Sequence, residues 1–248
     1  MDDNRIEDTR LHLVENADDA SDPREVLEWV ASNVDRLAVA TSFQSSGMVI
    51  LHLMKTIRPD VPVLFLNTGF HFEETLAFRN RIVEQWQLNL VELRGEHGSP
   101  QRQSEIHGAA LYRSNPDLCC SINKVRPLQQ ALENYDGWIS GVRRDQSEGR
   151  AGIPLIGKQV LPSGRWVLNI HPLANWTKDD VAAYIEHHDI PTHPLLENGY
   201  SSVGCWPCTR PVDAHEDERA GRWPGQDKTE CGIHSIGIDT GRQHAAEA

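Results

Sequence analysis

The stretch LAVATSFQSSGMVILHLMKTIRPDVPVLFLN, residues 37–67, decides the fold class of this chain. Residues 37–42 form a short β-rich run, residues 47–57 form an apolar stretch of helical length, and residues 61–67 form a second β-rich run. A strand, a helix and another strand in this order make a βαβ unit, whose two strands lie parallel in one sheet. The stretch therefore predicts an α/β protein.

The same alternation continues along the chain. Further β-rich runs lie at 88–93, 137–142 and 166–170, and helical stretches lie at 72–87, 124–135 and 177–187. Repeated βαβ units predict a doubly wound, mostly parallel sheet. The acidic first 35 residues read as helix, with apolar Val26, Leu27, Val30, Ala31 and Val34 on one face, and we expect them to cap the core. We predict a single domain over residues 1–235 and a mobile C-terminal tail over residues 236–248.

The composition limits the classes of function. The chain has 248 residues with 24 Lys and Arg against 36 Asp and Glu, a net charge of −12, which argues against nucleic acid as the main partner. The mean hydropathy is −0.50, and no apolar run approaches the length of a membrane span. The N-terminus resembles no secretory signal, so we expect a cytoplasmic protein without a membrane segment. Homo-oligomerisation stays open.

The five cysteines divide into two pairs and one single residue. Cys119 and Cys120 are adjacent, Cys205 and Cys208 form a C-x-x-C pair, and Cys231 stands 23 residues further on. A reducing compartment favours metal ligands or reactive thiols over disulfides. Four thiolates suit a zinc ion or a [4Fe–4S] cube, and adjacent ligands favour the larger cube. Buried core cysteines, or a redox-active dithiol at the C-x-x-C pair, remain as alternatives.

Two further features indicate an anion site. Residues 42–47, Ser-Phe-Gln-Ser-Ser-Gly, follow a strand and open a helix, as a phosphate-binding loop does, although an ordinary turn gives the same pattern. Lys and Arg residues follow the later predicted strands and helices. Those that stand directly after a strand are favoured as ligand-binding residues, because α/β sheets hold ligands at the carboxyl ends of their strands. Runs of charge are more often solvated faces. The candidate cations are Lys124, Arg143, Arg144, Arg210, Arg219 and Arg222.

Four segments together carry a resemblance to a known family. They are Cys119-Cys120 with Lys124, Gly-Val-Arg-Arg-Asp-Gln-Ser at 141–147, Gly-Cys-Trp-Pro-Cys-Thr-Arg-Pro at 204–211 and Glu-Cys-Gly-Ile-His at 230–234. The chain resembles the assimilatory adenylyl-sulfate (APS) reductases of the phosphoadenylyl-sulfate (PAPS) reductase family over about residues 30–235. The loop departs from the commoner family form Ser-Phe-Ser-Gly-Ala-Glu-Asp, because Gln44, Ser45, Ser46 and Gly47 replace its last residues.

The resemblance implies the fold, the cofactor and the reaction. It implies a sheet like that of the adenine-nucleotide α-hydrolases, one [4Fe–4S] cluster on Cys119, Cys120, Cys205 and Cys208, and a nucleophile at Cys231. APS would be reduced to sulfite and AMP through an S-sulfonated Cys231. With four cysteines on metal, Cys231 has no resolving partner in its own chain, so a thioredoxin or glutaredoxin would reset it. A dianionic substrate and a thiolate repel each other, so cations must screen them. The expected substrate-binding residues are Ser42, Lys124, Arg143, Arg144, Arg219, Arg222 and His234.

Three other functions compete with this one. A PAPS reductase is the nearest, although family members of that type generally lack the cluster cysteines. An ATP-dependent adenylating or thiolation enzyme with a metal site would carry a Ser-Gly-Gly-x-Asp-Ser loop, which the sequence lacks. A metal-stabilised nucleic-acid-binding module is disfavoured by the charge of −12 and by the unpaired fifth cysteine.

Overall fold

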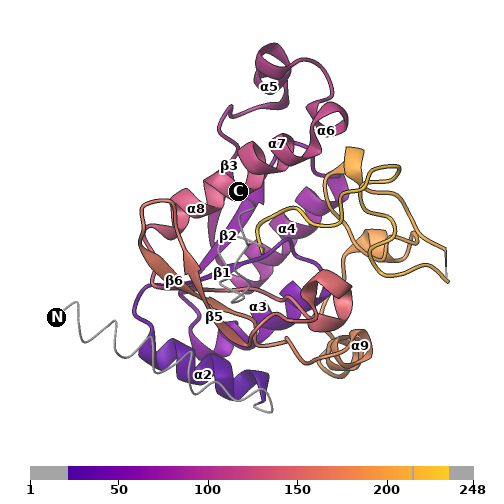
Figure 1. Cartoon of the computed structure of the whole chain (residues 1–248). Helices are drawn as coiled ribbons and strands as arrows, with labels where there is room; N and C mark the ends of the chain where they lie inside the picture. The colour runs from indigo at the N-terminus through magenta and orange to yellow at the C-terminus, as the bar shows by residue number, and fades with distance from the viewer. Residues whose placement is uncertain (1–21, 214, 235–248) are drawn as a thin grey trace, which may run out of the picture.

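A six-stranded sheet forms the centre of the computed structural model, which describes residues 22–213 and 215–234 (Figure 1). The strand order is β3-β2-β1-β4-β6-β5, and every pairing is parallel except that between β5 and β6. This confirms the predicted doubly wound, mostly parallel sheet. The strands are β1 (Leu37–Ala40), β2 (Pro62–Asn67), β3 (Asn89–Arg94), β4 (Gly137–Ile139), β5 (Ile156–Val160) and β6 (Trp166–Ile170).

Helices pack on both faces of the sheet because successive strand residues point to opposite sides. Leu37 and Val39 of β1 belong to a core cluster with residues of α2, α3, α4 and α9, whereas Ala38 between them packs with α8 on the other face. The helices are α2 (Pro23–Asn33), α3 (Ser45–Ile57), α4 (Glu73–Trp86), α5 (Pro100–His107), α6 (Leu111–Ser114), α7 (Pro116–Cys120), α8 (Arg126–Leu132) and α9 (Lys178–His187). Short 3₁₀ turns are η2 (Arg144–Gln146), η3 (Glu148–Arg150), η4 (Pro194–Leu196) and η5 (Trp206–Cys208).

The predicted N-terminal cap is confirmed for its described part. Asp22 accepts a hydrogen bond from the backbone of Arg24 and starts α2, which buries Val26, Leu27 and Val30 in the larger core cluster. Residues 1–21 and the predicted tail at 236–248 lie outside the described residues.

Three parts of the fold differ from the sequence prediction. The short helices α5, α6 and α7 were not predicted. The helix expected at 124–135 begins at Arg126, because residues 121–125 form a π-helical turn, η1 (Ser121–Val125), which continues directly from α7. Strand β5 was not predicted. It pairs antiparallel with β6 through a turn that contains Pro162 and Gly164, and such turn residues between two apolar runs are the signal that could have revealed it.

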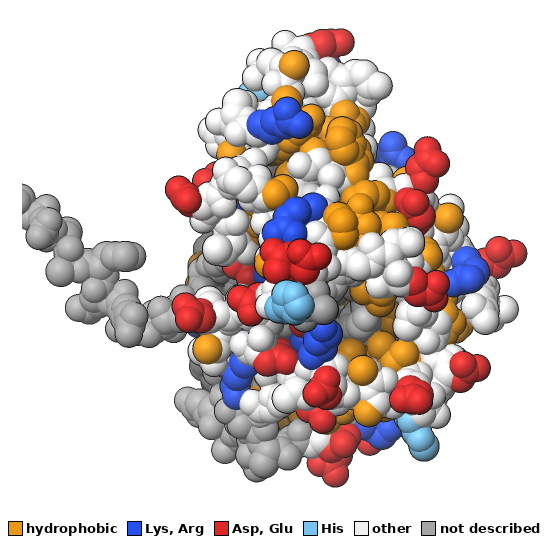
Figure 2. Space-filling model, turned by 90° about the vertical axis from the view of Figure 1, so that its right-hand side faces the viewer, with side chains coloured by type: hydrophobic (Ala, Val, Ile, Leu, Met, Phe, Trp, Pro, Cys, Tyr) orange, Lys and Arg blue, Asp and Glu red, His pale blue; other side chains and the backbone are white. Residues whose placement is uncertain are grey.

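The segment that carries Cys205 and Cys208 lies to one side of the sheet, near α6 and α7 (Figure 1). The face that carries it has hydrophobic side chains gathered over its upper half, with charges of both signs around them (Figure 2). Trp206, between Cys205 and Cys208, is 50% exposed. No helix within the described ranges is long and apolar enough to cross a membrane.

Candidate active site

A cavity of about 210 Å³ opens at the carboxyl ends of β1 and β4. Residues 40–42 and 44–47, at the end of β1 and beyond it, and residues 140–143 after β4 line it. These two strands are neighbours at the point where the strand order changes direction, so the crevice beyond their ends is the ordinary ligand site of an α/β sheet. We take this cavity as the candidate active site.

Two glycines bring the first turn of α3 against the strand ends. A Cβ on Gly47 would lie 2.3 Å from Thr41 Oγ1, and a Cβ on Gly141 would lie 2.7 Å from the carbonyl carbon of Ser46. Only glycine fits at such close approaches. The start of α3 therefore lines the cavity, where the free N–H groups of a helix N-terminus favour an anion.

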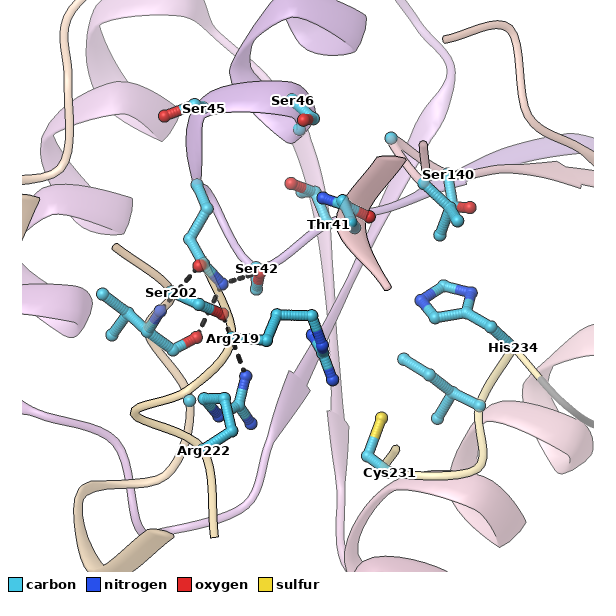
Figure 3. Close-up of a pocket in the computed structure, with 18 of the residues that line it drawn as sticks. Thr41, Ser42, Ser45, Ser46, Ser140, Ser202, Arg219, Arg222, Cys231 and His234 are labelled. Carbon is cyan, nitrogen blue, oxygen red and sulfur yellow. Dashed lines mark hydrogen bonds between the residues drawn. The ribbon is translucent and has the colours of Figure 1, made fainter. Parts of the chain in front are cut away.

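The structure brings most of the predicted site residues to this cavity, although they come from four distant segments. Figure 3 shows Cys231 and His234 on one side, Ser42, Ser202 and Arg222 on the other, and Arg219 between them. Cys231 is partly exposed, as a reacting thiol must be. The predicted residues that line the cavity are Ser42, Lys124, Arg143, Arg219, Arg222, Cys231 and His234.

The cavity contains buried polar atoms that lack a partner. Within the described part of the chain, Arg219 Nε, Arg222 Nε and His234 Nδ1 are buried and make no hydrogen bond. Burial, together with the nearby Arg150 charge, lowers the pKa of Arg219 to about 10, so its guanidinium stays protonated at neutral pH. Burial, Arg150 and His171 hold the pKa of His234 well below 6.5, so its ring is neutral. Because unsatisfied buried donors are costly, these atoms point to a ligand with oxygen acceptors.

Arg143 and Arg144 follow β4 together but lie in different surroundings. Arg143 is buried in the cavity wall, where it donates to Ser46 Oγ at 2.7 Å and pairs with Asp145 and Glu218. Asp145 and Glu218 balance the charge of Arg143, and its direct contact with the loop at 42–47 is the hydrogen bond to Ser46. Arg144 does not line the cavity, because its guanidinium donates to the carbonyl oxygen of Ile153 and to Asn175. Arg144 is therefore the predicted substrate-binding residue that the structure does not bring to this cavity, and its role at the substrate stays a prediction.

An ion-pair network beside Cys231 was missed from the sequence. Arg150 Nε and Nη2 donate to the two carboxylate oxygens of Glu230 at 2.8 and 2.7 Å, and Arg219 Nη2 lies 3.1 Å from the same carboxylate. Burial alone would raise the pKa of Glu230, but the hydrogen bonds and charge of Arg150 and the charge of Arg219 lower it overall. Glu230 precedes Cys231, so the network anchors the segment that carries Cys231 at the cavity. The Glu-Cys-Gly-Ile-His motif begins with Glu230 and could have revealed this residue, whereas Arg150 stands in no motif that the sequence analysis identified.

A second, smaller cavity is lined by the other four cysteines. Cys119 and Cys120 come from α7, Cys205 precedes the 3₁₀ turn η5, and Cys208 is its last residue. Lys124, on the π-helical turn, lines both cavities, and π-helical turns are frequent at functional sites. Burial lowers the pKa of Lys124, but Cys205, Cys231 and Cys120 raise it by more, so the ammonium is held in its charged form.

The thiols of this smaller cavity interact with one another. Burial raises the pKa of Cys119 to about 11 and of Cys208 to about 12, and neighbouring cysteines add to both shifts. Within residues 22–213 and 215–234, no three His, Cys, Asp or Glu side chains group closely enough to hold one metal ion. Thiols kept protonated by burial and by each other are inert unless a metal displaces their protons.

Comparisons with known proteins assign the family. A family model, the phosphoadenosine phosphosulfate reductase domain, matches residues 36–211. Adenosine 5'-phosphosulfate reductases of Streptomyces coelicolor and Salinibacter ruber are 42% and 39% identical over 85% and 97% of this chain, and over 87% and 94% of their own lengths. A phosphoadenosine 5'-phosphosulfate reductase of Gloeobacter violaceus is 39% identical over 93% of this chain and 95% of its own. The chain belongs to the phosphoadenosine phosphosulfate reductase family, which confirms the family predicted from its motifs.

Solved structures agree with this fold. The phosphate complex of phosphoadenylyl-sulfate reductase from Candida auris is 29% identical, matches 85% of this chain and 98% of its own, and superposes with a TM-score of 0.68. An FMN adenylyltransferase of Candida glabrata is 12% identical over 92% of this chain and 84% of its own, with a TM-score of 0.55, and shares the fold alone.

Proposed function

We propose that this chain reduces adenylyl sulfate to sulfite and AMP in sulfate assimilation, with Cys231 as the nucleophile. The observation that carries the proposal is the placement of a partly exposed cysteine in one cavity with Arg219, Arg222 and Lys124. The relatives named adenosine 5'-phosphosulfate reductases, at about 40% identity over most of the chain, support the substrate.

The first half-reaction transfers a sulfonate group to the protein. The Cys231 thiolate attacks the sulfur of the phosphosulfate, a new S–S bond forms, and the S–O bond to phosphate breaks so that AMP leaves with the electron pair. Arg219, Arg222 and Lys124 reduce the repulsion between the thiolate and the anionic substrate. Neutral His234 offers Nδ1 to an oxygen of the nucleotide or sulfate, in place of the partner it lacks.

The second half-reaction needs an external dithiol. One of its thiolates attacks Cys231 Sγ and releases sulfite, which leaves a mixed disulfide, and its second thiol then frees Cys231 and leaves the donor as a disulfide. The two electrons that reduce the sulfur come from the donor. A thioredoxin or glutaredoxin has this chemistry, and we infer that such a protein is the partner.

We also propose that Cys119, Cys120, Cys205 and Cys208 hold one [4Fe–4S] cluster. The proposal is supported by four cysteines that line one cavity and by the adjacency of Cys119 and Cys120, because adjacent ligands favour a cube over a single zinc ion. When bound, the cluster would place positive iron beside four thiolates and so fix the two cysteine segments near Lys124. Anaerobically purified protein should carry about four irons and four acid-labile sulfides per chain. Stoichiometric zinc without sulfide would contradict the assignment.

The test of the reaction separates the nucleophile from the ligands. Cys231→Ser should keep the iron content and visible colour but lose sulfite production, whereas Cys205→Ser should lose both. Wild-type protein mixed with APS and no thiol should release about one AMP per chain and gain a sulfonate on Cys231, detectable by intact-protein mass spectrometry. Substantial turnover by Cys231→Ser, or AMP release without the modification, would refute this mechanism.

A further inference from the structure

The amide of Gln44 links two segments that are 159 residues apart. Its Nε2 donates to Ser42 Oγ at 2.8 Å and to the carbonyl oxygen of Val203 at 2.6 Å, while its Oε1 accepts from the backbone N–H of Val203 at 2.7 Å. The dashed lines in Figure 3 include these bonds. Reversing the amide would face oxygen to oxygen and N–H to N–H at Val203, so the peptide group fixes its orientation.

This orientation decides the direction of the Ser42 hydroxyl. A serine hydroxyl has one proton to donate and two lone pairs that accept. Because Ser42 Oγ accepts from Gln44, its own proton is free to point elsewhere, and Ser42 lines the cavity. The hydroxyl thus stands beside the start of α3 as a donor for an anion.

The same amide also holds the opposite wall of the cavity. Val203 follows Ser202, whose Oγ accepts from Arg222 Nη1 at 3.3 Å, and Cys205 lies two residues beyond Val203. The two hydrogen bonds to the backbone of Val203 therefore hold the segment that carries Ser202 against the loop at 42–47. Both polar atoms of the Gln44 side chain are thus hydrogen-bonded to Ser42 or Val203.

We propose that Gln44 is a positioning residue for nucleotide binding, and this rests on the proposed function. It turns the Ser42 hydroxyl into the cavity as a donor to the phosphate or phosphosulfate of the adenine nucleotide, and it holds the phosphate loop against residues 201–205. Gln44 acts through Ser42 and Val203 and does not itself contact the substrate.

Two substitutions of similar size separate this role from general packing. Gln44→Met keeps the length of the side chain but loses all three hydrogen bonds. Gln44→Glu keeps the shape, reverses the polarity at Ser42 so that the hydroxyl donates to the carboxylate, and adds a negative charge near the anion. The control is Gln130→Glu on exposed residue Gln130 of α8, which makes the same charge change away from the cavity.

The full-length holoenzyme is titrated with AMP by calorimetry, and KM and kcat are measured with APS. Gln44→Met should weaken AMP binding and raise KM about tenfold, and Gln44→Glu about hundredfold, with kcat changed less than about threefold. Gln130→Glu should stay within about twofold of wild type. Ser42→Ala should weaken AMP binding about fivefold in the wild-type chain but not in Gln44→Glu, where the hydroxyl already points away.

AMP affinity in Gln44→Glu equal to that of wild type would overturn the inference. So would an effect of Ser42→Ala that is the same in both backgrounds, because it would show that Gln44 does not act through that hydroxyl. If AMP binding depends on Gln44 and Ser42 as described, but the wild-type enzyme makes no sulfite from APS, the proposed reaction fails and the positioning role of Gln44 stands.

Discussion

Glu230→Gln removes one negative charge from the residue that precedes Cys231 while keeping its size. In the native protein this carboxylate accepts two hydrogen bonds from Arg150 and faces Arg219, and its side chain is 20% exposed. Arg150 is more deeply buried, at 8%. The amide can accept at one oxygen only, and its NH₂ group would face the guanidinium of Arg150.

The magnitude follows from the bonds that are lost. A hydrogen bond to a charged group contributes roughly 1.5–3 kcal/mol. The amide keeps one hydrogen bond from the charged Arg150 and loses the other, so the substitution should cost about 2–3 kcal/mol. If this loss falls on the position of Cys231 relative to the substrate, kcat falls about 30- to 150-fold. KM for APS should stay constant or fall, because Arg150 and Arg219 no longer share their charge with Glu230.

The assay is steady-state sulfite formation with a saturating dithiol protein, together with urea unfolding of each variant. Glu148→Gln is the matched control, since Glu148 is exposed in η3 and the charge change is the same. We expect its kcat to match wild type. If Glu230→Gln lost 2–3 kcal/mol of unfolding free energy and yet kept kcat within about threefold, the network would be structural and would not position the nucleophile.

Two further predictions concern the substrate and the pH. The cavity-lining residues after β1 and at the end of β2 include no Lys or Arg, and Arg143, which donates to Ser46 of this loop, is already paired with two carboxylates. A 3'-phosphate placed there would therefore lack a cation of its own, and kcat/KM for APS should exceed that for PAPS by at least about tenfold. Steady-state rates on both nucleotides measure this ratio, and equal rates would contradict the prediction. Burial, with Arg150 and Arg144 nearby, lowers the pKa of His171 to about 3 in the folded protein. Below pH 6.5 this histidine is therefore protonated in the unfolded chain but stays neutral in the folded chain. Stability should therefore fall by about 2 kcal/mol more in wild type than in His171→Asn between pH 7 and pH 5. Urea unfolding at both pH values measures this difference, and parallel losses in the two proteins would show that His171 is not the cause.

The sequence alone determined the family and most of the order of strands and helices, although not strand β5 or the short helices α5, α6 and α7. Strands β1, β2, β3, β4 and β6 were each predicted, because a short apolar run is a local property of the sequence, and it was present even in β3, whose residues are partly buried or exposed. The cysteine spacing and the Glu-Cys-Gly-Ile-His motif identified the family because they are contiguous in sequence. Boundaries were less certain: the π-helical turn at 121–125 keeps a helical pattern, so nothing in the periodicity separated it from α8.

Only the tertiary structure decided which charged and polar side chains meet. Arg143 and Arg144 are adjacent in sequence, yet one lies in the cavity wall and the other bonds to Ile153, because the chain turns into η2 between them. Arg150 and Glu230 are 80 residues apart, and Gln44 and Val203 are 159 apart. Such contacts leave no periodic pattern in the sequence, because they depend on how the strand ends bring distant loops together. The network of Arg150, Arg219 and Glu230 beside Cys231 consists of contacts of this kind.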